Sequence, residues 1–186
     1  MTIRVVIAED EAIIRLDLKE TLEEEGYEVV GETGRGDEAV DLVKQHQPDL
    51  AILDVKMPGM DGLEAASAIT AEKGAAVLIL TAFSQRDLIE KARDAGALAY
   101  LVKPFQKSEL IPAVEVALGR FQEMKALAEE NLSLADQLET RKLVDRAKGK
   151  LMDGHDMSEG DAFRFLQKTA MDTRSTLRQV AQDVID

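Results

Sequence analysis

Four short apolar runs, each ending in a polar or charged residue, are the feature of this chain that most restricts its fold. The residues at these ends are Asp10, Asp54, Thr81 and Lys103. The strands of an open parallel sheet direct their C-terminal ends toward one crevice, where α/β proteins place their chemistry. We therefore expect two acids, a hydroxyl group and an ammonium group to meet at one edge of a sheet.

The first 120 residues alternate apolar runs with segments of helical periodicity, such as 12–25. Strands are expected near residues 3–8, 28–32, 50–53, 77–80 and 99–102. Strands that are apolar throughout are typical of a parallel sheet covered on both faces, and right-handed crossovers make such a sheet doubly wound. The sequence predicts an α/β fold with a doubly wound five-stranded parallel sheet, followed by a long helix and a small three-helix domain.

A long helical pattern runs from Pro112 to about Leu151. Within it, apolar and small residues recur at alternating three- and four-residue steps, the spacing of a coiled-coil seam with one Asn inside it. The seam comprises Val114, Ala117, Phe121, Met124, Ala128, Asn131, Ala135 and Leu138. It either joins two copies of the chain or packs against its own domain or a neighbouring helix, and both interpretations stay open.

The last fifty residues have the pattern of a three-helix unit. A loop is expected at 153–156, and Ser158 with Asp161 marks the start of the next helix. A break is expected at 171–173, before a last helix that begins near Leu177. We predict one domain over residues 1–120, a helical connection over 121–135 and a second domain over 136–186.

Composition and charge narrow the function classes. The absence of cysteine excludes disulfides and thiolate metal sites. The apolar runs are too short to cross a bilayer, and the start lacks the regions of a signal peptide, so we expect a cytoplasmic protein without membrane contact. Net charge is −13: residues 136–186 hold 9 Lys and Arg against 10 Asp and Glu, and residues 1–135 hold 14 against 26. The acidic part is unsuited to nucleic acid, whereas the near-neutral end is suited to it if its cations share a face.

The acids at the strand ends fit phosphoryl chemistry. A carboxylate such as Asp54 can act as a nucleophile toward phosphorus. Clustered acids repel each other unless a cation lies between them, and oxygen ligands next to a phosphate suit Mg²⁺. Lys103 and Thr81 are suited to bind phosphate oxygens. Each residue alone is more often a turn former or a solvated side chain, but the set in this order favours a phosphoryl-acceptor site.

Four motifs make residues 1–120 resemble a two-component receiver domain, which has a flavodoxin-like fold. They are Ala8-Glu9-Asp10-Glu11, Leu53-Asp54-Val55-Lys56-Met57-Pro58, Leu80-Thr81-Ala82 and Tyr100-Leu101-Val102-Lys103-Pro104-Phe105. The resemblance implies that a sensor histidine kinase phosphorylates Asp54 and that Lys103 is the lysine of the family's site. It implies no further enzyme activity than the self-phosphorylation and dephosphorylation chemistry of receivers.

The same resemblance implies a metal site and a switch. Mg²⁺ is expected on Asp10, Asp54 and the Lys56 carbonyl, with Glu9 alongside where many members carry Asp. Thr81 and Tyr100 match the family's switch pair, and the Lys103–Pro104 peptide bond is expected to be cis.

The tail holds a cluster of positive charge: Arg141, Lys142, Arg146, Lys148 and Lys150 lie within ten residues. From charge alone, a solvated face is the more ordinary interpretation. However, the segments Leu138–Gly149, Met157-Ser158-Glu159, Ala162-Phe163, Ala170-Met171-Asp172 and Val180-Ala181 resemble an ANTAR domain, the RNA-binding output module of transcription antitermination regulators. The resemblance implies that the target is a pair of stem-loops in a leader transcript.

Sequence-specific RNA readers place cations on phosphates and contact unstacked loop bases. Our candidates for RNA contact are Arg141, Arg146, Lys148, Arg174 and Arg178. Phe163 and Phe165 are assigned to the core. Ala147 and Gly149 would allow close approach either of the RNA backbone or of another helix, and the sequence does not separate these readings.

The expected mechanism is a switch. Phosphorylation of Asp54 draws in Thr81, Tyr100 turns inward, and the long helix shifts toward a homodimer that presents two RNA-binding units. Two alternatives are a receiver with a DNA-binding output and a regulator that acts only through protein contacts. The tail lacks a helix-turn-helix pattern, and the net charge disfavours binding to duplex DNA.

Overall fold

A computed structural model of the protein describes residues 2–82 and 86–186. The chain forms two compact units; the first ends at Met124 and the second begins at Lys125. None of the helices in the described ranges has the length and hydrophobicity that a bilayer-spanning segment needs.

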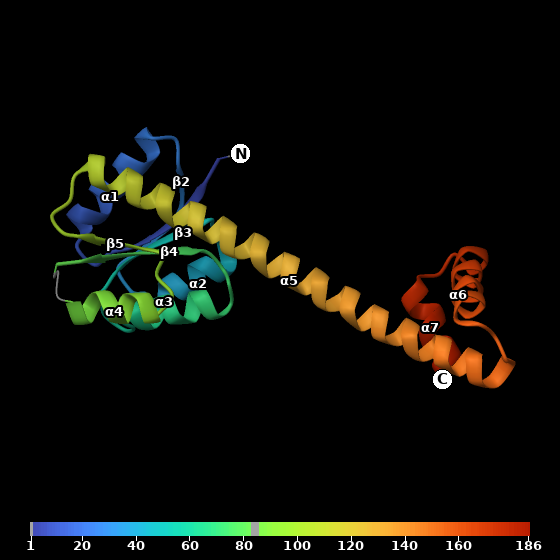
Figure 1. Ribbon diagram of the computed structural model, residues 1–186. Coiled ribbons are helices and arrows are strands. Elements are labelled where there is room, and N and C mark those ends of the chain that lie inside the picture. Colours follow the sequence, from blue (N-terminus) through green and yellow to red (C-terminus); the bar gives the residue numbers. More distant parts are fainter. Residues whose placement is uncertain (1, 83–85) are drawn as a thin grey trace. The chain divides into compact units, whose positions relative to one another are not determined.

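The first unit is built on a parallel sheet of five strands in the order β2-β1-β3-β4-β5 (Figure 1). The strands are β1 Arg4–Ala8, β2 Glu28–Thr33, β3 Leu50–Asp54, β4 Ala76–Thr81 and β5 Ala99–Val102. Neighbours in this order that are distant in sequence require crossovers, which the helices between the strands supply. The predicted doubly wound α/β fold is confirmed, and each strand lies within one residue of its expected position.

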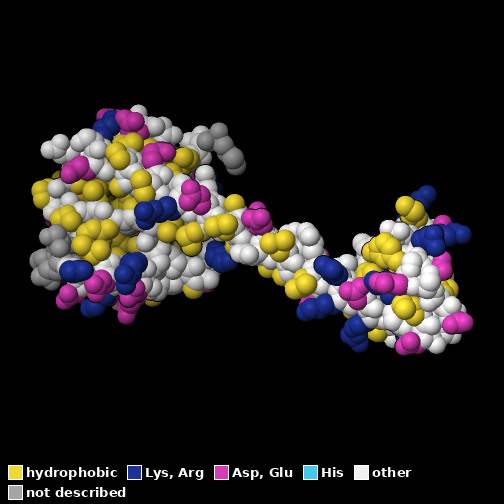
Figure 2. Space-filling view, viewed as in Figure 1, with side chains coloured by type: hydrophobic (Ala, Val, Ile, Leu, Met, Phe, Trp, Pro, Cys, Tyr) yellow, Lys and Arg dark blue, Asp and Glu magenta, His cyan; other side chains and the backbone are white. Residues whose placement is uncertain are grey.

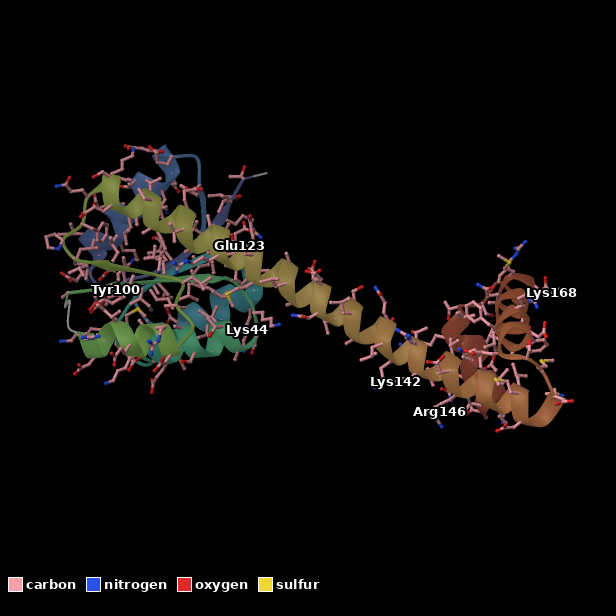
Figure 3. The ribbon with its side chains drawn as sticks, in the orientation of Figure 1. Lys44, Tyr100, Glu123, Lys142, Arg146 and Lys168 are labelled. Carbon is pink, nitrogen blue, oxygen red and sulfur yellow. The ribbon has the colours of Figure 1, made fainter. Side chains whose placement is uncertain are left out.

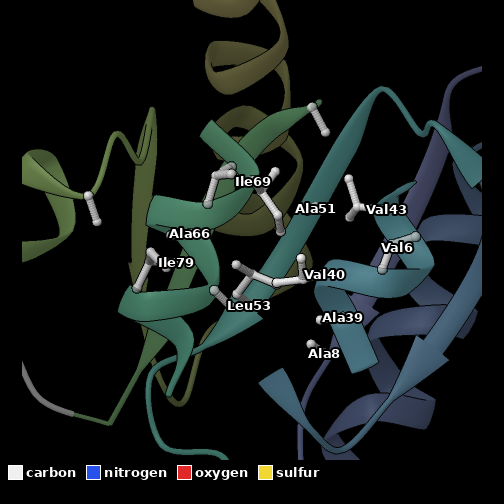
Figure 4. Packing of buried hydrophobic residues seen from close by; sticks show 14 of the residues in the cluster. Val6, Ala8, Ala39, Val40, Val43, Ala51, Leu53, Ala66, Ile69 and Ile79 are labelled. Atoms are coloured by element: carbon white, nitrogen blue, oxygen red, sulfur yellow. The ribbon is translucent and has the colours of Figure 1, made fainter. Parts of the chain in front are cut away.

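Helices cover both faces of this sheet. The helices that follow the first four strands are α1 Ala12–Glu24, α2 Gly36–His46, α3 Gly62–Ala71 and α4 Arg86–Asp94. On one face, Leu53 and Ile79 pack against α2 and α3 (Figure 4). On the other face, Ile52 and Leu78 pack against α1 and against α5 Lys107–His155, the helix that follows β5. Because alternate residues of one strand enter opposite cores, β3 and β4 are apolar at every position before their last residue, Asp54 or Thr81.

The fifth helix, α5, runs from Lys107 to His155 and contributes to both units. It begins five residues before the expected start and includes Pro112. The predicted seam is not one exposed surface, because Val114 and Ala117 are buried in the core beside the sheet and Phe121 packs against it. Beyond them, large apolar side chains of α5 are exposed (Figure 2). These are Met124, Leu127, Leu132, Leu134, Leu138 and Met152.

The second unit packs the last turns of α5 against α6 Glu159–Thr173 and α7 Leu177–Ile185. Its core holds Val144, Ala147, Leu166 and Ala181 among others. As predicted, Ser158 caps α6, since its hydroxyl oxygen accepts a hydrogen bond from the Asp161 backbone N–H.

Three expectations for this unit are wrong. Residues 153–155 belong to α5, which continues until Asp156 adopts a left-handed conformation with φ 52°. The break at 171–173 is absent from the described residues, because α6 continues to a left-handed cap at Arg174 with φ 53°. Phe163 and Phe165 are 36% and 43% exposed, since Ala162 and Leu166 occupy the buried face of α6.

Candidate functional site

The register of the sheet brings the residues at the strand ends together. Ala8 pairs with Leu53, so Glu9 and Asp10 emerge beside Asp54. On the other side of β3, Asp54 pairs with Leu80, which places Thr81 one position further along. Val102 pairs with Thr81, and Lys103 follows it. The acids, the hydroxyl group and the ammonium group therefore share one edge of the sheet.

Lys103 lies at the centre of this site. Its Nζ is 2.9 Å from Glu9 Oε2 and 3.0 Å from Asp54 Oδ1. Glu11 Oε1 lies 3.6 Å away on the open side. Glu9, Asp54 and Thr81 are buried. The Lys103–Pro104 peptide bond is cis, as expected.

The loop after β3 fixes the position of the Asp54 carboxylate. The Lys56 backbone N–H donates to Asp54 Oδ2 at 3.2 Å. The chain then turns into α3, whose N-cap Asp61 accepts hydrogen bonds from two backbone N–H groups of the first turn. Gly62 begins this helix pressed against the strand: a β-carbon there would lie 1.9 Å from the Asp54 carbonyl oxygen. Only glycine lets the helix start so close to the strand end.

Burial and ion pairing oppose each other within the site. Burial raises the pKa of Glu9 and of Asp54, because it disfavours the charged carboxylate, and the hydrogen bonds from Lys103 only partly offset this. Burial also works against the charged form of Lys103, but its bonds to Glu9 and Asp54 outweigh that effect and raise its pKa. The ammonium group is therefore charged at neutral pH.

The acids of the site suit a divalent cation. Carboxylate oxygens of Glu9, Asp10 and Asp54 lie within 4.8 Å of one another. One ammonium group does not balance three carboxylates, and a set of hard oxygen ligands is what Mg²⁺ prefers. The backbone N–H of Lys56 contacts Asp54, whereas a role for its carbonyl in metal binding stays a prediction.

Thr81 and Tyr100 lie on the same face of neighbouring strands. Tyr100 pairs with Ile79, which is two residues before Thr81 on β4. Side chains two positions apart on a strand point to one face, and Ile79 and Tyr100 both pack in the core covered by α2 and α3. Figure 3 shows Tyr100 beside this sheet.

Arg15 joins the site without having been singled out from the sequence, and Glu11, quoted there within the first motif, joins it without having been given a role. Arg15, one turn into α1, donates from a guanidinium nitrogen to the Glu9 carbonyl at 2.5 Å, and Glu11 lies close to Lys103. The sequence position of Arg15 gave no signal, because its contact with the Glu9 carbonyl depends on how α1 leaves the sheet.

The basic residues of the second unit differ in their partners. Lys148 binds Asp145 and Glu159 at 2.8 Å each, and Arg178 pairs with Asp136. Lys142 binds Glu139 at 2.9 Å. Within residues 125–186, all of which the structure describes, Arg141, Arg146 and Arg174 have no ion pair with an acid. These three predicted RNA contacts are available without loss of an internal bond.

Comparison with known proteins assigns both units. Residues 5–115 match the family described as response regulator receiver domain, and residues 133–185 match the ANTAR domain. The chain belongs to the response regulators. It is 60% identical to the transcriptional regulatory protein PdtaR of Mycobacterium tuberculosis. The match covers 98% of this chain and 89% of PdtaR. It is a response regulator whose receiver controls an RNA-binding ANTAR output.

Further relatives match the receiver. The chemotaxis protein CheY of Bacillus subtilis is 36% identical over its whole length and 64% of this chain. Among solved structures, the receiver domain of the putative response regulator NarL from Mycobacterium tuberculosis has a TM-score of 0.61 and 32% identity, over 63% of this chain and 97% of that chain. A CheX–CheY complex with BeF₃ and magnesium from Borrelia burgdorferi has a TM-score of 0.58 and 28% identity. That match covers 60% of this chain and 86% of the matched chain.

Replacing Gly62 with Ala should disturb the receiver site. The added methyl group must push the Asp54 main chain away, so we expect a loss of about 2 kcal/mol in the free energy of unfolding and slower phosphorylation by acetyl phosphate. Gly160→Ala is the matched control, because that glycine also lies in the first turn of a helix but its β-carbon would meet only Ser158 Oγ, at 3.9 Å. Equal phosphorylation rates in the two variants would contradict this view of Gly62.

Replacing Lys103 with Met should leave buried carboxylates without their cation. We expect a loss of about 3 kcal/mol at neutral pH, measured by urea unfolding without Mg²⁺. Lys107→Met is the control: Lys107 also pairs with two carboxylates, but its side chain is 44% exposed against 10% for Lys103, so its loss should cost less than about 1 kcal/mol.

The pH dependence gives this prediction a second readout. The pKa values of Glu9 and Asp54 are already raised in the folded protein, and removing Lys103 raises them further. Above these pKa values the buried, charged carboxylates of Glu9 and Asp54 destabilise the folded state. As the pH falls and they become protonated, this destabilisation disappears. The stability difference between Lys103→Met and the unaltered protein should therefore shrink as the pH falls, and a difference that grew in acid would contradict the ion-pair account.

Proposed function

We propose that Asp54 is the phosphoacceptor of this receiver and that a sensor histidine kinase is the donor. The observation that carries this proposal is the buried Asp54 carboxylate held 3.0 Å from Lys103 Nζ, beside the acids Glu9 and Asp10. An oxygen of Asp54 attacks phosphorus, and the bond between phosphorus and the kinase histidine nitrogen breaks. Lys103 then stabilises the added negative charge on the phosphoryl oxygens.

The acids around Asp54 would hold Mg²⁺. Asp10, Asp54 and the Lys56 carbonyl are the proposed ligands, with Glu9 alongside, since their oxygens match the donors that this ion prefers. When bound, the ion supplies positive charge that offsets the repulsion between the acids and an incoming phosphoryl group. Apart from receiver-type self-phosphorylation and dephosphorylation, we assign no enzyme activity to the chain.

Thr81 and Tyr100 are the proposed switch. Thr81 is buried at the end of β4, one position beyond the residue that pairs with Asp54, so its hydroxyl is well placed to bind a phosphoryl oxygen on Asp54. Movement of Thr81 frees space on the face that it shares with Tyr100. The half-buried Tyr100 ring then turns inward, and the surface near β5 repacks.

The output is proposed to act in transcription antitermination. The ANTAR unit binds a pair of stem-loops in a leader transcript in the cytoplasm and prevents a terminator from forming. Arg141, Arg146 and Arg174 are the contacts that need no internal ion pair to break. Lys148 and Arg178 stay in the predicted contact set, but each has a carboxylate partner to exchange for a phosphate.

Two stem-loops suit two ANTAR units, so we propose a homodimer formed on phosphorylation. The exposed part of α5 provides a seam at three- and four-residue steps. It differs from the seam predicted from sequence by having Leu127 and Leu134 in place of Ala128 and Ala135. It comprises Met124, Leu127, Asn131, Leu134 and Leu138. A single Asn among large apolar residues is typical of a coiled coil with a defined register.

Replacing Asp54 with Asn should abolish phosphate-dependent RNA binding, because an amide does not form the acyl phosphate. We would measure affinity for a labelled two-stem-loop leader RNA with and without acetyl phosphate and Mg²⁺, and mass by light scattering. Asp41→Asn, on the exposed surface of α2, should respond like the unaltered protein. An Asp54→Asn variant that still responded to the phosphodonor would refute the assignment.

Replacing Arg146 with Ala should weaken RNA binding about tenfold and reduce its salt dependence by roughly 0.7 in the log–log slope, since one phosphate contact is lost. Arg93→Ala, which removes an exposed arginine of α4, is the control and should leave both quantities unchanged. Preference for duplex DNA in competition would favour a DNA-binding output, and no nucleic-acid affinity in either phosphorylation state would favour a regulator that acts through protein contacts.

A further inference from the structure

Gly149 lies inside α5, six residues before the helix ends at His155. Glycine inside a helix lowers helix stability relative to alanine, because more backbone freedom is lost on folding. A glycine at such a position is therefore unfavourable unless the absence of a side chain allows a contact that alanine would block.

Packing within the chain does not supply such a contact. A β-carbon at Gly149 would have no heavy atom of the described residues within 4 Å beyond its own helix surroundings. At Gly36, by contrast, a β-carbon would lie 2.1 Å from the Met60 carbonyl oxygen. Ala147 is fully buried in the core of the second unit. Of the two small residues considered from sequence, Ala147 thus serves helix packing and Gly149 does not.

The surroundings of Gly149 are cationic. Gly149 follows Arg146 by three positions and Lys142 by seven, so the three residues share one face of α5. Val144, Ala147 and Leu151 turn the other face toward the core. Figure 3 shows Lys142 and Arg146 on successive turns of α5.

The cations near Gly149 differ in the partners that they would exchange for an anion. Arg146 has no ion pair among the described residues, and Lys142 binds only the exposed Glu139. Lys150, the next residue, donates to the Ile185 carbonyl. Of the nearby acids, Asp145 is engaged by Lys148, and Asp153 lies one turn beyond Gly149, on the side away from Arg146.

We infer that Gly149 is the point at which the sugar–phosphate backbone of the bound RNA passes in van der Waals contact with α5, with Arg146 and Lys142 on the adjacent phosphates. The inference rests on the proposed RNA binding by this unit. The glycine donates no free N–H, because amides inside a helix are already bonded. Its contribution is the missing side chain, which lets the strand approach the helix and shortens the reach of the two cations.

A second copy of the chain is the other candidate for this face, and the charges argue against it. The large apolar residues of α5 that are more than half exposed lie between Met124 and Leu138, about three to seven helical turns before Gly149. Near Gly149 itself the exposed set holds only Met152, which is 39% exposed. Two copies meeting at Gly149 would bring Arg146 and Lys142 of one chain near those of the other, which is repulsive. A polyanion meets the same surface favourably.

The test is Gly149→Ala, with Gly119→Ala as the matched control. Gly119 lies in the same helix and its β-carbon would also have no heavy atom of the described residues within 4 Å. Both variants should melt at a temperature equal to or above that of the unaltered protein, because alanine favours the helix. After treatment with acetyl phosphate and Mg²⁺, Gly149→Ala should bind the two-stem-loop RNA about tenfold or more weakly, and Gly119→Ala should bind it unchanged. Gly149→Leu should bind more weakly still.

Three outcomes would overturn the inference. If the unaltered protein binds the RNA and Gly149→Ala binds it equally well, the inference fails and the proposed function stands. If the unaltered protein does not bind the RNA, both fail. If Gly149→Ala loses RNA affinity only together with a fall in mass by light scattering, the glycine seats a second copy of the chain instead of RNA.

Discussion

The ammonium group of Lys103 is the interaction on which the receiver site depends. It holds Glu9 and Asp54, which come from different strands, at 2.9 and 3.0 Å, and it does so where burial makes both carboxylates costly to charge. A parallel sheet is what makes this possible, since it delivers the ends of β1, β3, β4 and β5 to one edge in register. The cluster remains short of positive charge, and this deficit is what prepares it for a divalent cation and for chemistry at Asp54.

Much of this site followed from sequence because it depends on few physical rules. Apolar runs locate strands, parallel strands share an edge, and the residue after each run must lie at that edge. Register was beyond such reasoning: that Thr81 and Tyr100 share a face follows only from the pairing of Tyr100 with Ile79. The contact of Arg15 with the Glu9 carbonyl was likewise hidden, because it depends on the angle at which α1 leaves the sheet.

The second unit was less predictable because its signals are weaker. Both errors in helix length end at residues in the left-handed conformation, Asp156 and Arg174, and neither is the glycine that usually marks a helix end. Hydrophobicity alone placed Phe163 and Phe165 in the core, but a short helix buries a narrow stripe, and Ala162 and Leu166 fill it. Counting cations was also insufficient, since Lys148 serves to join α5 to the start of α6.

The helix α5 connects the receiver to the ANTAR unit, and its two ends are stabilised by packing whereas its middle is not. Its first turns are buried beside the sheet through Val114 and Ala117, and its last turns are buried in the second unit through Val144 and Ala147. Between these anchors, most residues from Gln122 to Glu139 are exposed, and most helical stability in proteins comes from tertiary packing of an apolar face. The exposed stretch therefore contributes little stability of its own and leaves large apolar side chains in water. The α5 helix of a second copy that covered this surface would stabilise the stretch. A small change at the receiver surface could therefore shift the equilibrium between the exposed and the paired helix.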